Sequence, residues 1–215
     1  MELDTRQRIL DAADQLFGEV GLDAAATRDI AERCGVNKAL IHYHFSTKDE
    51  LLVAVLDRYY ARLTVTLERA LAGDAGPRDR LVSVLEAYID FLGANPGFFR
   101  IIQREIAGGR HVDRIAARML PLFRVAETLI TETWPATKKG PLSAAALLVS
   151  FYGMVITHFS YSPVVAELTG SDPLSPERLR RHKRHLVRML DLVLHEIEIE
   201  HDTGEPATAA VAKRK

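Results

Sequence analysis

What this sequence lacks excludes several protein classes. It has a single cysteine, Cys34, in 215 residues, so no internal disulfide can form, and such a content is typical of a reducing compartment. Its N-terminus lacks the basic segment followed by an apolar run that marks a secretory signal peptide. The most apolar stretch, residues 144–159, is shorter than the ~20 residues that span a bilayer and includes His158. We therefore expect a cytoplasmic protein with no membrane partner.

Motifs of catalytic and cofactor sites are also missing. The chain has no glycine-rich phosphate loop, no Gly-x-Ser-x-Gly and no Cys-x-x-Cys. His182 and His185 have the spacing of metal ligands on one helix face, but no carboxylate or thiol beside them completes a site. Cys34 is interpreted as a packing residue rather than a redox sensor. The prediction is a protein that is not an enzyme and holds neither a metal nor a cofactor.

Strand signals are absent as well, and helical signals take their place. No segment shows sustained apolar/polar alternation, and no Asn-Gly or Asp-Gly hairpin turn occurs. Apolar residues recur at helical spacing between explicit breaks, which predicts an all-α fold of about nine helices. Asn37, Thr47 and Asn95 are the predicted N-terminal caps of their helices. The other predicted starts and breaks are Gly21, Thr27, Gly35, residues 73–77, residues 108–109, residues 140–141 and residues 175–177.

One segment, residues 27–46 (TRDIAERCGVNKALIHYHFS), meets the requirements of a helix-turn-helix. Two short helices that cross closely need a small residue at the crossing, and Ala31 provides it. Four residues later, Gly35 can adopt the positive φ that the turn requires. Six residues further on, Ile41 is the branched residue that docks the second helix on the first. The other residues expected on the buried side are Ile30, Cys34 and Val36.

The second helix of this motif turns a mixed face outward. With Ile41 and Phe45 inward, helical spacing directs four other residues outward. They are Lys38, Ala39, His42 and Tyr43. A cation, a methyl group, an imidazole and a phenol suit the base edges and thymine methyls of a DNA major groove. The helix starts near Thr27 and Lys48 supply backbone N–H groups for phosphates.

Residues 8–56 contain further spaced features. They are Ile9-Leu10-x-Ala12-Ala13, Leu16-Phe17, Gly21, Thr27, Asp29-Ile30-Ala31, Gly35-Val36, Tyr43-x-Phe45 and Lys48-x-x-Leu51-Leu52. With them, this segment resembles the N-terminal domain of TetR-family transcriptional regulators, and the resemblance covers about a quarter of the chain. It implies that the following residues touch DNA: Thr27, Arg28, Lys38, Ala39, Leu40, His42, Tyr43, His44 and Lys48. The family usually has tyrosine where this chain has His42, so a phosphate contact there would depend on pH.

Overall charge does not indicate nucleic-acid binding. The net charge is −1, and residues 1–60 hold seven basic and eleven acidic side chains. Between Arg28 and Lys48, however, four cations accompany two carboxylates, with His42 and His44 in addition. We therefore expect a local positive field, a modest nonspecific affinity and a strong dependence on salt.

The resemblance also implies the domain organisation and the function. It predicts a DNA-binding domain over residues 1–50 and a helical ligand-binding and dimerisation domain over residues 51–201, joined by a helix over 48–71. Composition predicts a disordered tail over 202–215. The implied function is that of a repressor that binds a palindromic operator in double-stranded DNA as a homodimer. A small hydrophobic or amphipathic effector would release it.

Two helices of the second half are candidates for the dimer interface. The helix after residues 140–141 is apolar nearly all round, and the last helix has an apolar stripe. Such helices either pair with their symmetry mates in a four-helix interface or line the core of one subunit. The interface candidates are Leu147, Phe151, Val155, Leu186, Leu190, Val193 and Ile197. The basic run over 178–188 is either a nucleic-acid contact or a solvated helix face.

An effector cavity is expected among the helices of the second domain. The candidate wall residues are Phe91, Phe98, Phe99, Arg104, Met119, Phe123, Trp134, Tyr152, Met154 and His158, each of which has plain core packing as its alternative. Arg104 and Glu105 form either polar recognition groups or an exposed salt bridge. Two other functions stay open: a DNA-binding interaction protein, such as the nucleoid-occlusion members of the family, and a helical enzyme or lipid carrier with an incidental helix-turn-helix.

Overall fold

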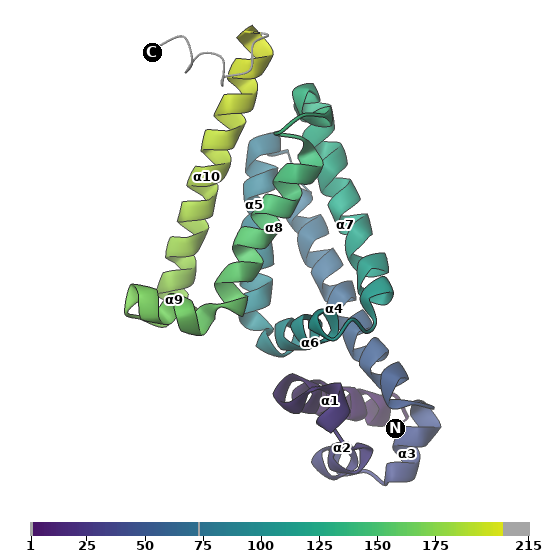
Figure 1. The fold of residues 1–215 in the computed structure, drawn as a ribbon. Coiled ribbons are helices and arrows are strands. Elements are labelled where there is room, and N and C mark those ends of the chain that lie inside the picture. The colour runs from purple at the N-terminus through teal and green to yellow at the C-terminus, as the bar shows by residue number, and fades with distance from the viewer. Residues whose placement is uncertain (1, 73, 204–215) are drawn as a thin grey trace. The chain divides into compact units, whose positions relative to one another are not determined.

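The computed structural model describes residues 2–72 and 74–203, and within them it is helical, with no strand (Figure 1). The elements are α1 (Glu2–Ala24), α2 (Thr27–Cys34), α3 (Lys38–His44), α4 (Lys48–Leu71), α5 (Pro77–Ala94), α6 (Pro96–Ala107), α7 (Val112–Thr133), η1 (Pro135–Lys138), α8 (Ala144–Ser160), α9 (Ser162–Thr169) and α10 (Pro176–Thr203). The all-α prediction is confirmed. The expected number of helices was one too low for the described residues, because α9 was not predicted.

Local signals explain most of the helix ends. Gly21 has φ 84° and breaks the helical conformation near the end of α1. At the start of α4, the Glu50 backbone N–H donates to Thr47 Oγ1 at 3.0 Å, and the Glu50 carboxylate accepts from the Ser46 N–H at 2.9 Å. The predicted cap is therefore present. The Glu50 carboxylate, however, accepts from the backbone N–H of Ser46 rather than from that of Thr47, which a capping box would use. The missed helix α9 carries Pro163 in its first turn, where proline is tolerated and does not end a helix.

Asn95 does not cap α6 as predicted. Its side chain makes no capping hydrogen bond; instead Nδ2 donates to the Phe91 carbonyl at 2.7 Å, and Oδ1 accepts from the Arg62 guanidinium at 3.1 Å. The residue is buried, with 8% of its surface exposed. A long-range partner on α4 has therefore replaced the local cap that the sequence favoured.

The chain divides into two compact units. Unit 1 consists of Met1–Thr66 and Phe91–Arg118, and unit 2 of Leu67–Asp90 and Met119–Lys215. The helices α4, α5 and α7 have residues in both. The predicted domain boundaries at residues 50 and 201 stay predictions. The helix α10 continues to Thr203, and the rest of the predicted tail lies outside the described residues.

In unit 1, the helix α6 packs on α1 (Figure 1). The two helices approach closely at Gly18 and Gly97, where a Cβ added to Gly18 would lie 3.1 Å from the Gly97 Cα. The Arg100 Nε donates to the Gly18 carbonyl at 2.9 Å. This packing explains why residues far beyond position 50 belong to the same unit as the helix-turn-helix.

In unit 2, a buried cluster of Leu190, Leu194 and Ile197 on α10 is the centre of one core region. Partly buried side chains pack against it. They are Leu81, Val82, Trp134, Leu142, Leu147, Phe151 and Val193. No single described helix has the length and apolarity to cross a bilayer, although α8 and α9, bent by 80° from one another, pass that test as a pair.

This core takes up several of the residues predicted for the dimer interface. Of the seven candidates, Val155, Leu186, Leu190 and Ile197 are buried within a single chain, and Leu147, Phe151 and Val193 pack on the α10 cluster. Leu147, Phe151 and Val193 are only half-buried and keep surface for a partner, whereas the other four are enclosed by their own chain. For those four, the reading that they line the core of one subunit is the one the structure supports.

Candidate nucleic-acid interface

The turn between α2 and α3 has the geometry that the sequence predicted. Gly35 adopts φ 64° and ψ 39° in the left-handed region, and it follows the last residue of α2. The Val36 N–H donates back to the Ala31 carbonyl at 3.0 Å, which closes the turn. A side chain at position 35 would strain this conformation by about 1 kcal/mol. Gly35 therefore lies at the bend and not within a helix.

The buried side of the motif is as predicted except at Val36, which is half-buried. Ile30, Ala31 and Ile41 are almost fully buried, with exposed fractions of 0%, 4% and 2%. Cys34 is buried beside them, and burial raises the pKa of its thiol. A buried thiol held in its neutral form is a packing group rather than a reactive one.

The outer side of α3 is open to solvent. Lys38, Ala39 and His42 are exposed, Leu40 is 41% exposed and Tyr43 is 73% exposed. The helix begins with Asn37, whose side chain accepts a hydrogen bond from the Ala39 N–H at 2.9 Å. Lys38 forms no ion pair with any of the described residues. The predicted face is thus accessible along its whole length.

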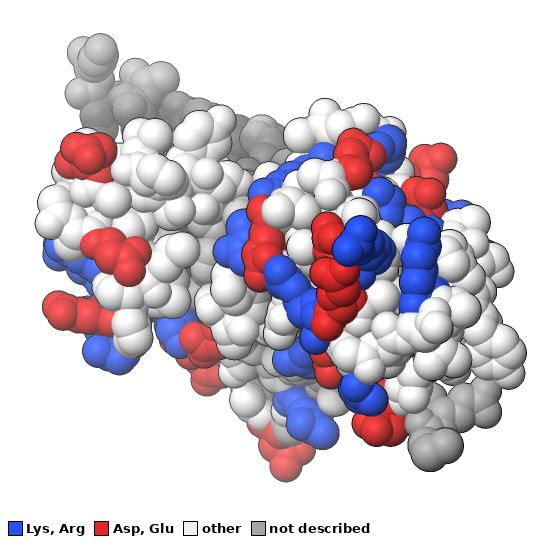
Figure 2. All heavy atoms as spheres, turned by 90° about the horizontal axis from the view of Figure 1, so that it is seen from below, with Lys and Arg blue, Asp and Glu red and all other residues white. Residues whose placement is uncertain are grey.

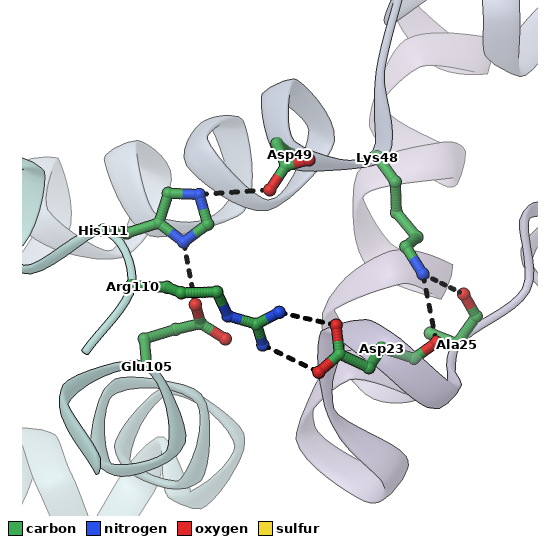
Figure 3. Close-up of polar contacts among 7 residues, drawn as sticks. All are labelled: Asp23, Ala25, Lys48, Asp49, Glu105, Arg110 and His111. Carbon is green, nitrogen blue, oxygen red and sulfur yellow. Dashed lines mark hydrogen bonds and ion pairs between the residues drawn. The ribbon is translucent and has the colours of Figure 1, made fainter. Parts of the chain in front are cut away.

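Other candidate DNA contacts already have intramolecular partners. The Arg28 guanidinium pairs with the Glu32 carboxylate at 2.7 Å, and both side chains are mostly exposed. The Lys48 Nζ donates to the carbonyls of Asp23 and Ala25 at 3.2 and 3.0 Å (Figure 3). Lys48 therefore connects the start of α4 to the segment before α2. Thr27 and His44 are half-buried.

The positive field of this motif is smaller than its four cations suggest. Arg28 is paired with Glu32, and Arg33 forms a bidentate pair with Glu19 at 2.8 and 2.9 Å. The surface seen in Figure 2 accordingly shows Lys and Arg interspersed with Asp and Glu, without one uninterrupted basic area. Among the described residues of this motif, Lys38 is therefore the principal cation outside an ion pair.

Two arginines of α1 contact the helix-turn-helix, one at the end of α2 and one just after α3. The sequence did not predict these contacts. The Arg8 guanidinium donates to the Cys34 carbonyl at the end of α2. The Arg6 guanidinium lies over the Phe45 ring, 5.1 Å from its centroid. In the sequence these residues contribute only charge, because nothing local connects them to positions more than 25 residues away.

The turn between α6 and α7 also contacts this region, through residues that were not predicted as a site (Figure 3). Arg110 forms a bidentate pair with Asp23 at 2.6 and 2.9 Å, which lowers the pKa of the Asp23 carboxyl. His111 lies between the carboxylates of Glu105 and Asp49, at 2.8 and 3.1 Å. Its φ of 54° is unusual for a residue other than glycine.

The predicted roles of Arg104 and Glu105 need correction. Arg104 is exposed, and its guanidinium donates to the carbonyls of Phe17, Gly18 and Glu19 at the end of α1. Glu105 is 2% exposed, so it is neither an exposed salt bridge nor a partner of Arg104. Both side chains are committed within unit 1.

The remaining effector candidates fall into two groups. Phe91, Phe98 and Phe99 are buried in unit 1, where the Phe98 ring stacks on Tyr59 at 4.8 Å. In unit 2 the candidates are half-buried: Met119, Phe123, Trp134, Tyr152, Met154 and His158. Phe123 and Tyr152 are in contact, with centroids 5.5 Å apart, and burial raises the pKa of Tyr152. Counting Arg104, four of the ten candidates therefore belong to unit 1 and six to unit 2.

Two of the histidines and cations near the start of α10 have partners on other helices. His182 stacks on His158 at 3.8 Å between ring centroids, and Lys183 pairs with Asp90 at 2.9 Å. Within residues 2–72 and 74–203, no group of three or more His, Cys, Asp or Glu side chains is arranged to hold a metal.

Comparisons with known proteins agree with this geometry. The family model for bacterial regulatory proteins of the tetR family matches residues 9–55. The HTH-type transcriptional repressor Rv3405c of Mycobacterium tuberculosis is 33% identical over 174 residues, which cover 80% of this chain and 81% of that protein. The HTH-type transcriptional activator FasR of Mycolicibacterium smegmatis is 36% identical over 99 residues, 46% of this chain and 45% of that protein. The nucleoid occlusion factor SlmA of Pasteurella multocida is 25% identical over 46% of this chain and 50% of its own.

Solved structures share the fold. A bacterial regulatory protein in the tetR family from Rhodococcus RHA1 superimposes with a TM-score of 0.70 and 24% identity, over 86% of this chain and 96% of that one. The fatty acid degradation regulator FadR from Bacillus halodurans gives a TM-score of 0.65 and 15% identity, over 85% and 94%. At these identities the likeness concerns the fold alone.

Proposed function

The chain belongs to the TetR family of bacterial regulatory proteins and is a transcriptional regulator, and from this premise we propose that it is an effector-released repressor. In this proposal it binds a palindromic operator as a homodimer. A small hydrophobic or amphipathic molecule in unit 2 lowers its affinity for that operator.

The exposed outer face of α3 is the single observation that supports the DNA contact most directly. Lys38, His42 and Tyr43 stand on one solvent-facing side of a helix that Gly35 and Ile41 hold in place. Lysine suits guanine acceptors, and Ala39 and Leu40 suit thymine methyls. The first amides of α2 have no side-chain cap, which leaves them available to a backbone phosphate.

Homodimerisation is supported by the surface of α8. Although this helix is apolar almost throughout, only Ala144, Val155 and Phe159 are buried in the single chain. Val149 is 68% exposed, and a Cβ added at Gly153 would meet no atom within 4 Å. On α10, Leu192 is 48% exposed. A second copy that covers these faces would supply the second α3 helix that a palindromic operator needs, whose half-sites lie about 34–36 Å apart.

Repression, rather than activation, is supported by the relative that matches most of the chain. The repressor Rv3405c is similar over 80% of this sequence, whereas the similarity to the activator FasR covers 46%. The match to the activator covers less than half of either chain.

An effector site in unit 2 is supported by the half-buried aromatic side chains there. Phe123 and Tyr152 contact one another, and Tyr88 stacks on Tyr152 at 6.2 Å. Apolar rings that a single chain does not bury are available to an apolar ligand. Because α4 has residues in both units, a ligand that displaces it would change the separation of the recognition helices. A coupling of about 1–3 kcal/mol gives about 5–150-fold weaker operator binding.

Operator selection followed by titration tests the proposal. Duplexes selected from a random library by the full chain are labelled, and their binding is followed by fluorescence anisotropy. The double variant Lys38→Ala/His42→Ala should bind about 100-fold more weakly. The control Lys138→Ala/Lys139→Ala removes two exposed cations of unit 2 and should keep the affinity. Full affinity of the first variant, or one subunit per site in sedimentation, would contradict the proposal.

Nucleoid occlusion is the second candidate, favoured by the similarity to SlmA over 46% of the chain. The two functions differ in the effect of gene deletion. A repressor's deletion raises transcripts beside the selected operator, whereas unchanged transcripts with many operator copies spread over the chromosome would favour the second candidate.

A further inference from the structure

Three ionisable side chains from two helices and a turn lie in a row in unit 1 (Figure 3). The Glu105 Oε2 of α6 is 2.8 Å from the His111 Nδ1, and the His111 Nε2 is 3.1 Å from the Asp49 Oδ1 of α4. The imidazole therefore bridges the end of α6 and the first turn of α4. Position 111 adopts a positive φ of 54°, which places this side chain in a turn conformation that few residue types accept.

The two ends of this bridge differ in solvent access. The side chain of Glu105 is 3% exposed and that of His111 is 13% exposed, whereas that of Asp49 is 62% exposed. A buried carboxylate depends on its hydrogen-bond partner, because water cannot replace it. An exposed carboxylate exchanges a protein partner for water at little cost.

The number of protons on the three groups decides whether both contacts are hydrogen bonds. An ionised carboxylate only accepts, and a neutral imidazole has one N–H donor. Both contacts are therefore satisfied only while the trio carries two protons, either both on the imidazole or one of them on Glu105. When one proton leaves, one contact must open.

The exposed contact is the one that opens. The remaining proton stays in the Glu105 contact, because that carboxylate has no access to water. Two cations lie near the trio, and the charge of one of them, Arg110, acts on both Glu105 and Asp49, but both cations have other hydrogen-bond partners. Arg110 is engaged with Asp23 in a bidentate pair, and the Lys48 Nζ is engaged with backbone carbonyls.

We propose that Glu105, His111 and Asp49 form a proton-dependent latch, which holds the first turn of α4 to the α6–α7 turn and releases it when one proton is lost. Its consequence for operator binding rests on the proposed function. Asp49 follows Lys48, which holds the carbonyls of Asp23 and Ala25 just before α2. A latched α4 therefore presents a more ordered helix-turn-helix, and the operator binds it more tightly.

Two measurements on the full chain without DNA test the latch. Long-range ¹H–¹⁵N spectra should show both ring nitrogens of His111 as proton donors, or in fast exchange with Glu105, at pH 6, and a single N–H at pH 9. Hydrogen exchange should give protection factors for the first turns of α4 that fall about five-fold between these pH values, after correction for intrinsic exchange.

The variant Asp49→Asn tests whether the pH dependence comes from the proton of the latch. Its amide both donates and accepts, so it contacts Nε2 in either protonation state, and protection in α4 should become independent of pH. The control Asp113→Asn removes an exposed carboxylate from the first turn of α7 and should keep the pH dependence. A wild-type protection that does not change with pH, or equal behaviour of the two variants, would overturn the latch.

Operator binding tests whether the latch affects the affinity for DNA. Because His42 and His44 are ionisable side chains of the helix-turn-helix that lie outside the latch, wild type is compared with Asp49→Asn rather than with itself at one pH. Between pH 6.5 and 8.5 the wild type should lose about three-fold more affinity than Asp49→Asn. Equal losses of affinity in the two proteins would show that the latch has no effect on DNA binding. If no operator can be selected, the proposed function fails while the exchange experiment still decides the latch.

Discussion

The two units differ in how completely one chain buries their apolar side chains. In unit 1, Leu51, Leu52 and Val55 of α4 are fully buried. In unit 2, α8 is the more apolar helix, yet only three of its 17 residues are buried. Unit 1 therefore has a core that a single chain encloses, which suits a part that must hold a fixed recognition surface. Unit 2 is left with apolar faces for further partners, which suits dimerisation and an effector.

The largest expected effect is on the free energy of unfolding, and it tests whether the two units differ in how completely their side chains are buried. Leu52→Ala removes a fully buried side chain of unit 1 and should lower the free energy of unfolding by about 3 kcal/mol. Leu81→Ala removes a half-buried side chain of unit 2 and should cost about 1 kcal/mol. Urea denaturation of both variants at one protein concentration measures the difference. Equal losses would mean that the two units are packed alike.

The next effect concerns the uncovered face of α8. Val149→Arg places a charge on a side chain position that is 68% exposed in the single chain. If a second copy covers it, the dimer dissociation constant should rise by about 100-fold. Val125→Arg changes a 53% exposed valine of α7 and should have no such effect. Sedimentation equilibrium distinguishes them, and an unchanged assembly in Val149→Arg would remove α8 from the interface.

A pH effect separates the histidines of the two units. His111 in unit 1 faces carboxylates, whereas His182 in unit 2 stacks on His158, and burial together with His158 and His185 lowers the pKa of His182 to about 4. A lowered pKa means that the unfolded chain takes up the proton first. Stability is therefore full above pH ~6.5 and falls as the pH drops toward 4.

The variant His182→Phe checks this effect. It keeps an aromatic ring against His158 and should remove most of the acid loss, at most about 2 kcal/mol because the group is partly solvated. Urea denaturation at pH 7.5 and pH 5 measures it. His195→Phe, an exposed site on the same helix, should keep the wild-type dependence, and an identical acid loss in His182→Phe would assign it to other groups.

The smallest expected effect concerns the cations of unit 1. Glu32→Ala releases Arg28 from its ion pair and makes it available to a phosphate, so operator affinity should rise about two- to three-fold and the salt dependence should steepen. Glu127→Ala removes an exposed carboxylate from unit 2 as the control. Anisotropy titrations over a range of salt concentrations measure both, and a flatter salt dependence in Glu32→Ala would exclude Arg28 from the phosphate contacts.

Short-range signals carried the parts of the fold and site that could be predicted. Gly35 ends α2 and Asn37 caps α3 because each acts on backbone within a few residues of itself. The inward position of Ile41 and the outward position of Lys38 follow from helical periodicity alone. Asn95 shows the limit, since its local capping preference was outweighed by the distant Arg62 and by burial.

The sequence by itself determined that this chain is helical, where its helix-turn-helix bends and which residues of α3 face outward, because backbone chemistry and periodicity are local properties. Only the tertiary structure decided which partner each apolar face meets. Periodicity marked Leu186 and Ile197 as an apolar stripe but could not say that the stripe faces the core of its own chain. Likewise, His111 became a bridge only when folding brought Glu105 and Asp49 to its two nitrogens, since they lie six and 62 positions away in the sequence.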